Sequence, residues 1–138
     1  MKIVYWSGTG NTAKMAELIA KGIIEAGKEA EIINVSDVNV DELLKEDTLV
    51  LGCSAMGDEV LEEGEFDPFI DEISTKISGK KVALFGSYGW GDGQWMRDWE
   101  ERMIGYGCLV PEDCLIIQNE PDDMEQECID FGKKVALL

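Results

Sequence analysis

The chain has 138 residues, enough for a single domain over residues 1–138 with a substantial hydrophobic core. Its 29 acidic and 12 basic residues give a net charge of −17, which argues against nucleic acid or an anionic membrane surface as a partner, since both are bound through Lys and Arg. No apolar run approaches the ~20 residues of a membrane span, and the first residues lead directly into an expected strand rather than a signal peptide.

Histidine and cysteine, two residue types common in catalytic and metal sites, give no sign of such a site here. There is no histidine, the usual general base near neutral pH, which weighs against a hydrolase. Cys53, Cys108, Cys114 and Cys128 show neither a CxxC pair nor a metal-ligand spacing. We therefore expect buried, reduced thiols in a cytoplasmic protein, with a disulfide or metal site as the less favoured alternative.

The first expected strand, residues 3–6, leads directly into the loop Ser-Gly-Thr-Gly-Asn-Thr of residues 7–12. A helical face follows, made by Met15, Leu18, Ile19, Gly22, Ile23 and Ala26. A loop between a strand and a helix N-terminus presents backbone N–H groups and a partial positive charge, which together bind phosphate. Because no Lys or Arg lies in the loop, the phosphate would be held by neutral dipoles. The alternative is an ordinary βα turn.

Two other phosphate loops fit these residues less well. A P-loop requires G-x-x-x-x-G-K-[ST], which the chain lacks. A dinucleotide fingerprint is formally present as Gly8, Gly10 and Ala13, with Asp37 near the end of the next strand. That match is weak, because such loops bring bare backbone against a pyrophosphate, whereas this loop carries polar side chains suited to a terminal phosphate.

The remaining segments alternate between strand and helix. Strands are expected at 31–35, 48–53, 81–85 and 114–117. Four further helices are expected. The first is short and capped by Asn39, and the second ends at Gly79 and carries Phe66, Phe69, Ile70, Ile73 and Ile77. The third buries Trp95, Met96, Trp99 and Met103, and the last begins at Pro121 and carries Met124, Cys128, Phe131 and Val135. Five apolar strands without alternation predict an α/β fold: a three-layer, doubly wound parallel sheet with its ligand at the carboxyl ends of the strands.

Two further loops meet that edge, residues 54–59 and 87–93. Trp90 stands between two glycines, on a segment too open to be ordinary core, and a flat aromatic there suits stacking on a planar ligand. Met56 could cover the opposite face of such a ligand with its polarizable thioether. Loop packing is the alternative for both residues. Trp95 and Trp99 lie on a helical face and are expected in the core, and Trp6 is expected to be structural.

Three segments at these spacings, Y-W-S-G-T-G-N-T, G-C-S-A-M-G-D-E and F-G-S-Y-G-W-G-D-G, resemble the short-chain flavodoxins of anaerobic bacteria. The similarity runs from end to end of the chain. It implies a flavodoxin-like strand order of 2-1-3-4-5 and flavin mononucleotide (FMN) as cofactor. The implied cofactor-binding residues are Ser7, Gly8, Thr9, Gly10, Asn11, Thr12, Ser54, Ala55, Met56, Gly57, Asp58, Glu59, Ser87, Tyr88, Gly89, Trp90, Gly91 and Asn119.

The resemblance also assigns roles within that set. The hydroxyl-rich loop and Ser54 would hold the phosphate, and Ser87 and Asn119 would lie near the ribityl chain, Asn119 on spacing alone. The two later loops would border the flavin ring between Met56 and Trp90, with Gly57 backbone near N5 and Glu59 near N3.

The implied function is a low-potential one-electron carrier that shuttles between semiquinone and hydroquinone and is not an enzyme. A carboxylate cluster (Asp58, Glu59, Glu62, Glu63, Glu65 and Asp92) would disfavour the anionic hydroquinone. The acidity favours basic-surfaced redox partners, reductases and oxidoreductases, for a monomer, although it could serve solubility alone. An FMN-dependent quinone or azo reductase is one alternative. A flavin-free response-regulator-like domain is another, but it would need an Asp where Cys53-Ser54 stand.

Overall fold

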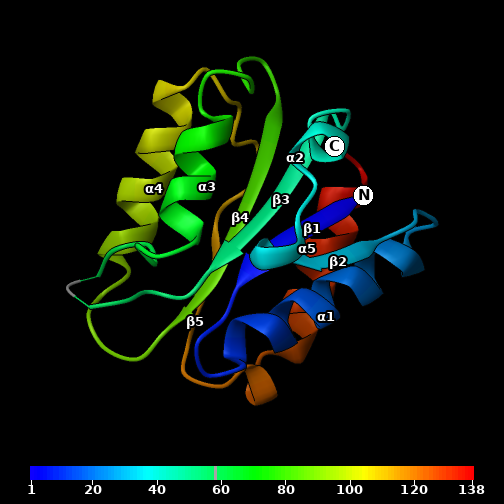
Figure 1. Ribbon diagram of the computed structural model, residues 1–138. Helices are drawn as coiled ribbons and strands as arrows, with labels where there is room; N and C mark the ends of the chain where they lie inside the picture. The colour runs from blue at the N-terminus through cyan, green and yellow to red at the C-terminus, as the bar shows by residue number, and fades with distance from the viewer. Residues whose placement is uncertain (58) are drawn as a thin grey trace.

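The computed structural model, which describes residues 1–57 and 59–138, is built on a parallel sheet (Figure 1). Its strands are β1 (Lys2–Trp6), β2 (Glu31–Asn34), β3 (Thr48–Cys53), β4 (Lys81–Tyr88) and β5 (Leu115–Gln118). They lie in the order β2-β1-β3-β4-β5, and every adjacent pair is parallel. In the central register, Ile3 pairs with Ile32 on one side and with Val50 on the other. The predicted sheet and strand order are confirmed.

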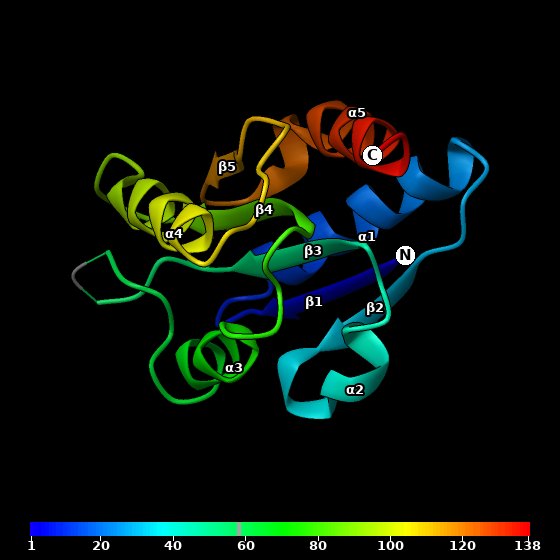
Figure 2. The same ribbon diagram turned by 90° about the horizontal axis from the view of Figure 1, so that it is seen from above.

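Helices cover both faces of the sheet (Figure 2). Side chains of α1 (Asn11–Glu25) and α5 (Glu125–Ala136) form one core, and those of α2 (Val40–Leu43), α3 (Phe66–Ile73) and α4 (Gln94–Gly105) form the other. Neighbouring strand residues enter opposite cores, as Ile3 and Val4 do, and both are fully buried. Burial on both faces explains why the central strands lack polar alternation. The predicted three-layer, doubly wound architecture is confirmed.

Strand boundaries differ from the sequence-based expectation by one residue in β1, β2 and β5 and by three residues in β4. β2 ends at Asn34, where the 3₁₀ turn η1 (Val35–Asp37) begins, and Ile32 is exposed because β2 is an edge strand. β4 continues to Tyr88 instead of ending at residue 85, so Ser87 and Tyr88 are strand residues and not loop residues. The extension follows from pairing with β5, which runs alongside β4 as far as Gln118.

Two helix boundaries were predicted wrongly. α3 ends at Ile73, before the expected Gly79, and the hydroxyl of Ser74 donates to the carbonyl of Asp71 at 2.7 Å where the helix stops. Ile77 is still fully buried, so the apolar spacing of residues 66–77 indicated which side chains are buried and not how far the helix extends. Pro121 opens a separate 3₁₀ turn, η2 (Pro121–Asp123), and Met124 lies 37 % exposed at the start of α5 instead of on its buried face.

Helices α1 and α5 approach each other through two glycines. A Cβ on Gly22 would lie 2.0 Å from the carbonyl oxygen of Ile129, and a Cβ on Gly132 would lie 2.1 Å from that of Ile19. Both obstacles are backbone atoms, which cannot rotate away as a side chain can. The absence of side chains at these positions therefore sets how closely the two helices pack.

This contact predicts a large difference among glycine-to-alanine substitutions. Gly22→Ala and Gly132→Ala should each lower the free energy of unfolding by about 1–3 kcal/mol, because the helices must separate. Gly105 is the matched control, since a Cβ there meets nothing within 4 Å. Gly105→Ala should raise the free energy of unfolding by up to about 1 kcal/mol through helix propensity. Urea unfolding measures all three, and equal effects would show that the α1–α5 contact is not tight.

Candidate functional site

Three buried hydroxyls meet at the carboxyl edge of the sheet. Thr12 lies in the first turn of α1, Ser54 follows β3, and Ser87 lies near the end of β4. The Thr12 Oγ1 atom lies 2.7 Å from Ser54 Oγ and 2.9 Å from Ser87 Oγ, and it accepts the backbone N–H of Ser87 at 3.2 Å. These contacts join the first turn of α1, the residue after β3 and the end of β4, so they fix the floor of the expected site.

The loop above this floor is shaped by Ser7. Its Oγ accepts the backbone N–H groups of Gly10 at 3.1 Å and Ala13 at 3.2 Å. In the described part of the chain, the N–H groups of Asn11 and Thr12 find no protein acceptor, as expected in the first turn of a helix. These neutral donors and the helix dipole suit a phosphate. The residues present therefore fit the phosphate end of FMN.

A cavity of about 140 Å³ lies beside this loop. It collects ten of the predicted residues: Gly8, Thr9, Asn11, Ser54, Ala55, Met56, Ser87, Tyr88, Gly89 and Asn119. Thr12 is not in the lining but is hydrogen-bonded to two lining residues, Ser54 and Ser87, and Trp90 directly follows the lining residue Gly89. The cavity is smaller than the roughly 300–1,000 Å³ of common ligand sites, so it suits the narrow part of a ligand whose remainder lies between the loops.

The loop after β3 is bridged by a pair of backbone hydrogen bonds. Met56 and Val60 exchange backbone hydrogen bonds of 2.9 Å in both directions, which closes the turn between them. Gly57 has a φ of +51°, in the left-handed region that favours glycine. The predicted residue Asp58 lies outside the described residues.

Glu59 has a contact that the sequence did not reveal. Its Oε1 accepts the backbone N–H of Gly93 at 3.1 Å and of Gln94 at 3.2 Å, at the start of α4. α4 has no cap from its own Gly93, so the cap comes from a residue 35 positions earlier than Gln94. The expectation that Glu59 meets flavin N3 remains a prediction, and the bond to α4 adds a second role.

The tryptophans separate as predicted. Trp90 is 64 % exposed, whereas Trp95 and Trp99 are both 1 % exposed and belong to the core. The indole N–H of Trp95 donates to the Cys53 carbonyl at 3.2 Å, which ties α4 to the end of β3. Met56 is 38 % exposed on the neighbouring loop. Two exposed, flat or polarizable side chains therefore lie on the two loops predicted to flank a ring. Trp6 is half-buried and packs against the core, and its structural role stays a prediction.

The segment after β5 contributes backbone geometry. Asn119 has a φ of +62°, and its N–H donates to the Tyr88 carbonyl at 2.7 Å, so the ends of β4 and β5 are held together. Gln118, which the sequence analysis missed, donates its Nε2 to the Gly89 carbonyl at 3.3 Å. Its position as the last residue of a strand at the ligand edge is the signal that could have pointed to it.

Some carboxylates of the predicted acidic cluster are engaged in hydrogen bonds or an ion pair. Glu62 accepts backbone N–H groups at the start of α3, namely those of Gly64 and Glu65 at 2.6 Å and of Phe66 at 3.0 Å. Partial burial acts to raise the pKa of Glu62, but these three donors outweigh burial and lower the pKa. Asp92 pairs with Arg97 at 2.9 Å. Exposed acidity near the loop therefore rests chiefly on Glu63 and Glu65 among the described members of the cluster.

The cysteines are unsuited to thiol chemistry at neutral pH. Burial raises the pKa of the Cys53 and Cys114 thiols to about 12 and that of Cys128 to about 11. Burial also raises the pKa of Cys108. Cys114 is only half-buried, contrary to the expectation, and the other three are buried. A thiol is reactive as its thiolate, so none of the four is poised as a nucleophile.

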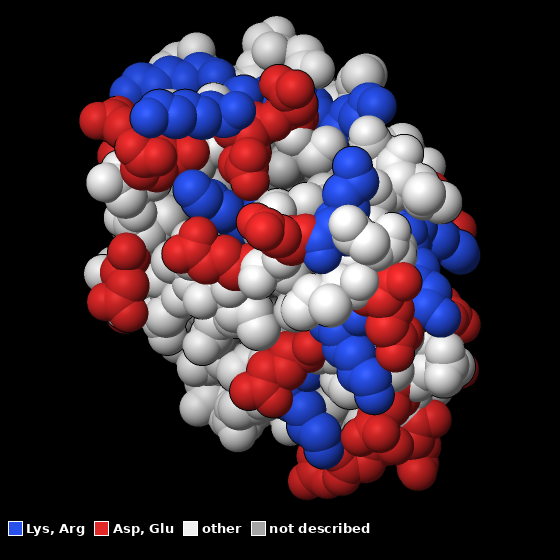
Figure 3. All heavy atoms as spheres, turned by 90° about the vertical axis from the view of Figure 1, so that its right-hand side faces the viewer, with Lys and Arg blue, Asp and Glu red and all other residues white. Residues whose placement is uncertain are grey.

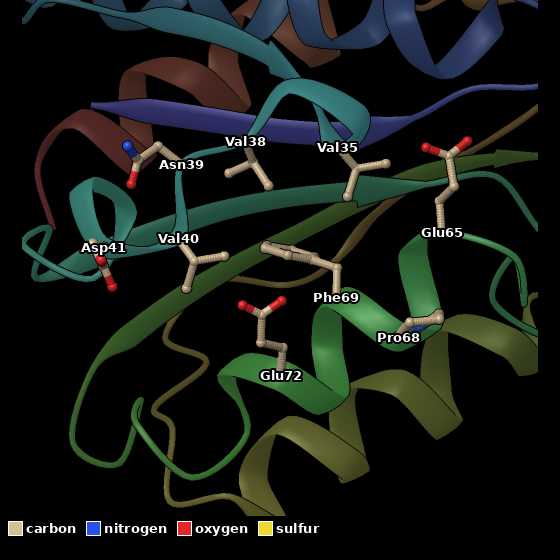
Figure 4. A pocket seen from close by; sticks show the side chains of 9 residues that line it. All are labelled: Val35, Val38, Asn39, Val40, Asp41, Glu65, Pro68, Phe69 and Glu72. Carbon is tan, nitrogen blue, oxygen red and sulfur yellow. The ribbon is translucent and has the colours of Figure 1, made fainter.

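Figure 4 shows a larger hollow, of about 520 Å³, between the η1–α2 segment and α3. It contains none of the predicted cofactor residues. Its lining carries the carboxylates of Asp41, Glu65 and Glu72 and has no Lys or Arg. A phosphate dianion would be repelled there, because like charges disfavour each other at short range. Chemistry therefore favours the smaller cavity as the cofactor site.

A doubly wound sheet with a neutral phosphate loop at its carboxyl edge defines a nucleotide-type cofactor-binding protein. The family model for flavodoxin matches residues 3–132. The chain is 81 % identical to a flavodoxin of Clostridium beijerinckii, with 99 % of each chain covered, and 43 % identical to that of Megasphaera elsdenii, with 99 % of this chain and 98 % of the relative covered.

Solved structures agree with the sequence relatives. The solution structure of two-electron reduced Megasphaera elsdenii flavodoxin superposes with a TM-score of 0.91 at 42 % identity, covering 99 % of this chain and 98 % of that one. A flavodoxin from the domain Archaea gives a TM-score of 0.84 at 32 % identity, covering 99 % of this chain and 97 % of that one. The chain therefore belongs to the flavodoxin family, whose members carry electrons on FMN.

The hydroxyl cluster gives a prediction that separates structural from ligand-facing threonines. Thr12→Val should lower the free energy of unfolding by about 1–3 kcal/mol, because two serine hydroxyls and a backbone N–H lose a buried partner. Thr9 is exposed and makes no such contact, so Thr9→Val should change stability by less than about 0.5 kcal/mol. Denaturant unfolding without added FMN compares the two variants. Equal stability of both would remove the cluster as a structural element.

Proposed function

We propose that this chain is a low-potential carrier that passes one electron at a time between protein partners, cycling its FMN between the one-electron-reduced and two-electron-reduced forms. The observation that carries the proposal is Trp90, which is 64 % exposed beside a cavity whose phosphate loop offers only neutral donors. A cofactor stacked there would keep one edge near the protein surface. That arrangement suits transfer to another protein better than the enclosure of a substrate.

The residues divide into binding and tuning groups. FMN, when bound, supplies the redox chemistry, and the protein supplies position and electrostatics. The first-turn N–H groups of α1 would hold the phosphate, and Trp90 and Met56 would cover the ring. The proposed binding set is the one predicted from the sequence, with Gln118 added because it holds the Gly89 carbonyl.

Carboxylates favour a low potential, because they disfavour adding negative charge to a nearby ring. A charge acting over roughly 10 Å of water-like medium contributes only about 0.4 kcal/mol. Several such contributions add, and about 1.4 kcal/mol shifts a one-electron potential by about 59 mV. Glu63 and Glu65 are the exposed members of the cluster that no cation neutralises among the described ion pairs.

Charge also supports a basic-surfaced partner. The segment 54–72, which includes the turn beside the cavity, contains eight acidic residues and no basic residue. Figure 3 shows a different face, on the right-hand side of Figure 1, where Lys and Arg side chains are interspersed with acidic ones. A cationic protein would therefore be steered to the loop edge rather than to that face.

The proposal also covers catalytic activity, oligomeric state, domain organisation and location. We assign no catalytic activity of its own to the chain, which we take to act as a monomeric, single-domain protein. No helix within residues 1–57 and 59–138 has the length and apolar character needed to cross a bilayer. Location in the cytoplasm is supported by four free thiols.

The absorption spectrum of the purified protein is the first test. A carrier should be yellow and should take up two electrons in separated steps during an anaerobic titration. Rapid multiple turnover with a small quinone or azo substrate would instead favour the reductase alternative. A colourless protein that does not bind added FMN would overturn the proposal.

Trp90 gives a quantitative test of the site. Trp90→Ala should weaken FMN binding by roughly 1–3 kcal/mol, through lost apolar area and stacking, while leaving stability without FMN nearly unchanged. Trp95→Ala should instead lower the free energy of unfolding by about 3–5 kcal/mol, because that indole fills the core. FMN titration and urea unfolding of both variants separate the effects. Unchanged FMN affinity in Trp90→Ala would place Trp90 outside the site.

The partner proposal predicts salt-dependent kinetics. Electron transfer to a basic haem protein should slow markedly as ionic strength rises past ~0.1 M, where the Debye length is about 10 Å. Replacing Glu63 and Glu65 together with Gln should slow transfer at low salt. Glu29→Gln with Glu31→Gln is the control, since it removes the same charge from exposed residues just before and at the start of β2. Stopped-flow rates that ignore salt would mean the acidity serves solubility.

A further inference from the structure

Trp6 is the last residue of β1, directly before the phosphate loop, and its side chain is half-buried. Side chains alternate between the two faces of a sheet along a strand. Ile3 and Tyr5 accordingly pack with the core of α1 and α5, whereas Val4 and Trp6 pack with the core of α2, α3 and α4. The Trp6 indole therefore lies on the face of the sheet opposite α1, the helix into which the loop leads.

The indole also contacts the phosphate loop itself, at Gly8. A Cβ on Gly8 would lie 3.0 Å from Cη2 and 3.3 Å from Cζ3 of Trp6, two atoms of the outer ring of the indole. Apart from the residues adjacent to Gly8, no other atom of the described part of the chain lies within 4 Å of that position. Trp6 is therefore the neighbour that leaves little room for a side chain at residue 8.

The reason for a glycine differs between Gly8 and Gly10. Gly10 has a φ of +95°, which favours glycine, and a Cβ there would meet nothing within 4 Å. Gly8 is not among the described glycines with a positive φ, so its backbone is open to other residues. Residue 8 is thus matched to the indole of Trp6 rather than to a backbone conformation.

We propose that Trp6 is a positioning residue for the phosphate loop, because its indole supports the backbone of Gly8 from the face opposite α1. Ser7 ties the same loop to α1, since its Oγ accepts the N–H groups of Gly10 and Ala13. The loop is thus held from both faces of the sheet. The bearing of this support on FMN rests on the proposed function, whereas the contact of Trp6 with Gly8 is a property of the protein without cofactor.

The position of the loop matters because its phosphate site contains no cation. Residues 7–12 include no Lys or Arg, so the phosphate would depend on hydrogen bonds from N–H groups such as those of Asn11 and Thr12. Hydrogen bonds weaken steeply when the donor is misaligned, whereas a charge acts over a longer range. A loop held in advance also avoids part of the ordering cost of binding. Trp6 should therefore strengthen phosphate binding by acting through Gly8.

Binding of FMN and of riboflavin to the full-length protein freed of flavin tests this role, because riboflavin lacks the phosphate. Trp6→Phe keeps an aromatic ring in the core but removes the outer ring of the indole. It should weaken FMN binding about tenfold and riboflavin binding less than about twofold, where tenfold corresponds to about 1.4 kcal/mol. Trp90→Ala should instead weaken both ligands alike, because ring stacking does not involve the phosphate. Equal losses for both ligands in Trp6→Phe would overturn the proposal.

The pairing of Trp6 with Gly8 is tested by a double-mutant comparison. Gly8→Ala should weaken FMN binding about tenfold in the parent, because the added methyl group meets the indole and displaces the loop. In the Trp6→Phe background the same substitution should weaken binding less than about twofold further, because the obstructing ring is gone. A loss of the same size in both backgrounds would mean that the methyl group obstructs the phosphate directly, and it would overturn the pairing.

Leu43→Ala is the control for general weakening of the core. Leu43 is fully buried in the same core as Trp6 but lies in α2, so its loss should lower stability without changing the ratio of FMN to riboflavin affinity. A change in this ratio as large as that in Trp6→Phe would make Trp6 an ordinary core residue.

Urea unfolding without flavin separates the contact from the cofactor assignment. Gly8→Ala should lower the urea midpoint in the parent and leave it nearly unchanged in the Trp6→Phe background. Equal shifts in the two backgrounds would overturn the contact. A protein that binds neither flavin would overturn the bearing on FMN, and the unfolding comparison would still decide the contact.

Discussion

The contact among the hydroxyls of Thr12, Ser54 and Ser87 is the interaction on which the site depends. It lies at the edge of the sheet where the parallel strands β1, β3 and β4 end. A buried hydroxyl without a partner is costly, and here each hydroxyl satisfies another. The phosphate loop rests on this buried layer, so its donors are held in place by the fold rather than by a ligand.

The distribution of charge follows from that arrangement. The phosphate loop carries no cation, and the dipole of α1 with its free N–H groups supplies the positive potential. The chain can therefore be strongly acidic elsewhere without losing its anion site. A neutral phosphate loop also leaves the negative charge of the neighbouring loop unopposed by any cation of its own.

Some of the acidity has a structural use. Glu59 and Glu62 accept backbone N–H groups at the starts of α4 and α3, where helices leave donors unsatisfied. The acidic cluster that the sequence predicts near the ring therefore contains two kinds of residue, helix caps and exposed carboxylates. The caps fix the loops, and Glu63 and Glu65 remain available to act at a distance.

The sequence by itself determined the order of elements, the doubly wound class and ten residues that the fold brings together around one cavity. These features depend on local signals: apolar runs for strands, helical spacing for Trp95 and Trp99, and a hydroxyl-rich loop directly after a strand. It also separated the exposed Trp90 from the buried tryptophans, because glycines on both sides of Trp90 leave no apolar periodicity.

Only the tertiary structure decided the features that join distant segments. The extension of β4 through Ser87 depends on pairing with β5, and the end of α3 depends on a turn that still buries Ile77. The Glu59 bond to α4 and the contact of Gly22 with Ile129 join residues 35 and 107 positions apart, respectively. Such contacts leave no periodic trace in the sequence, because they depend on where the sheet places the ends of its strands and helices.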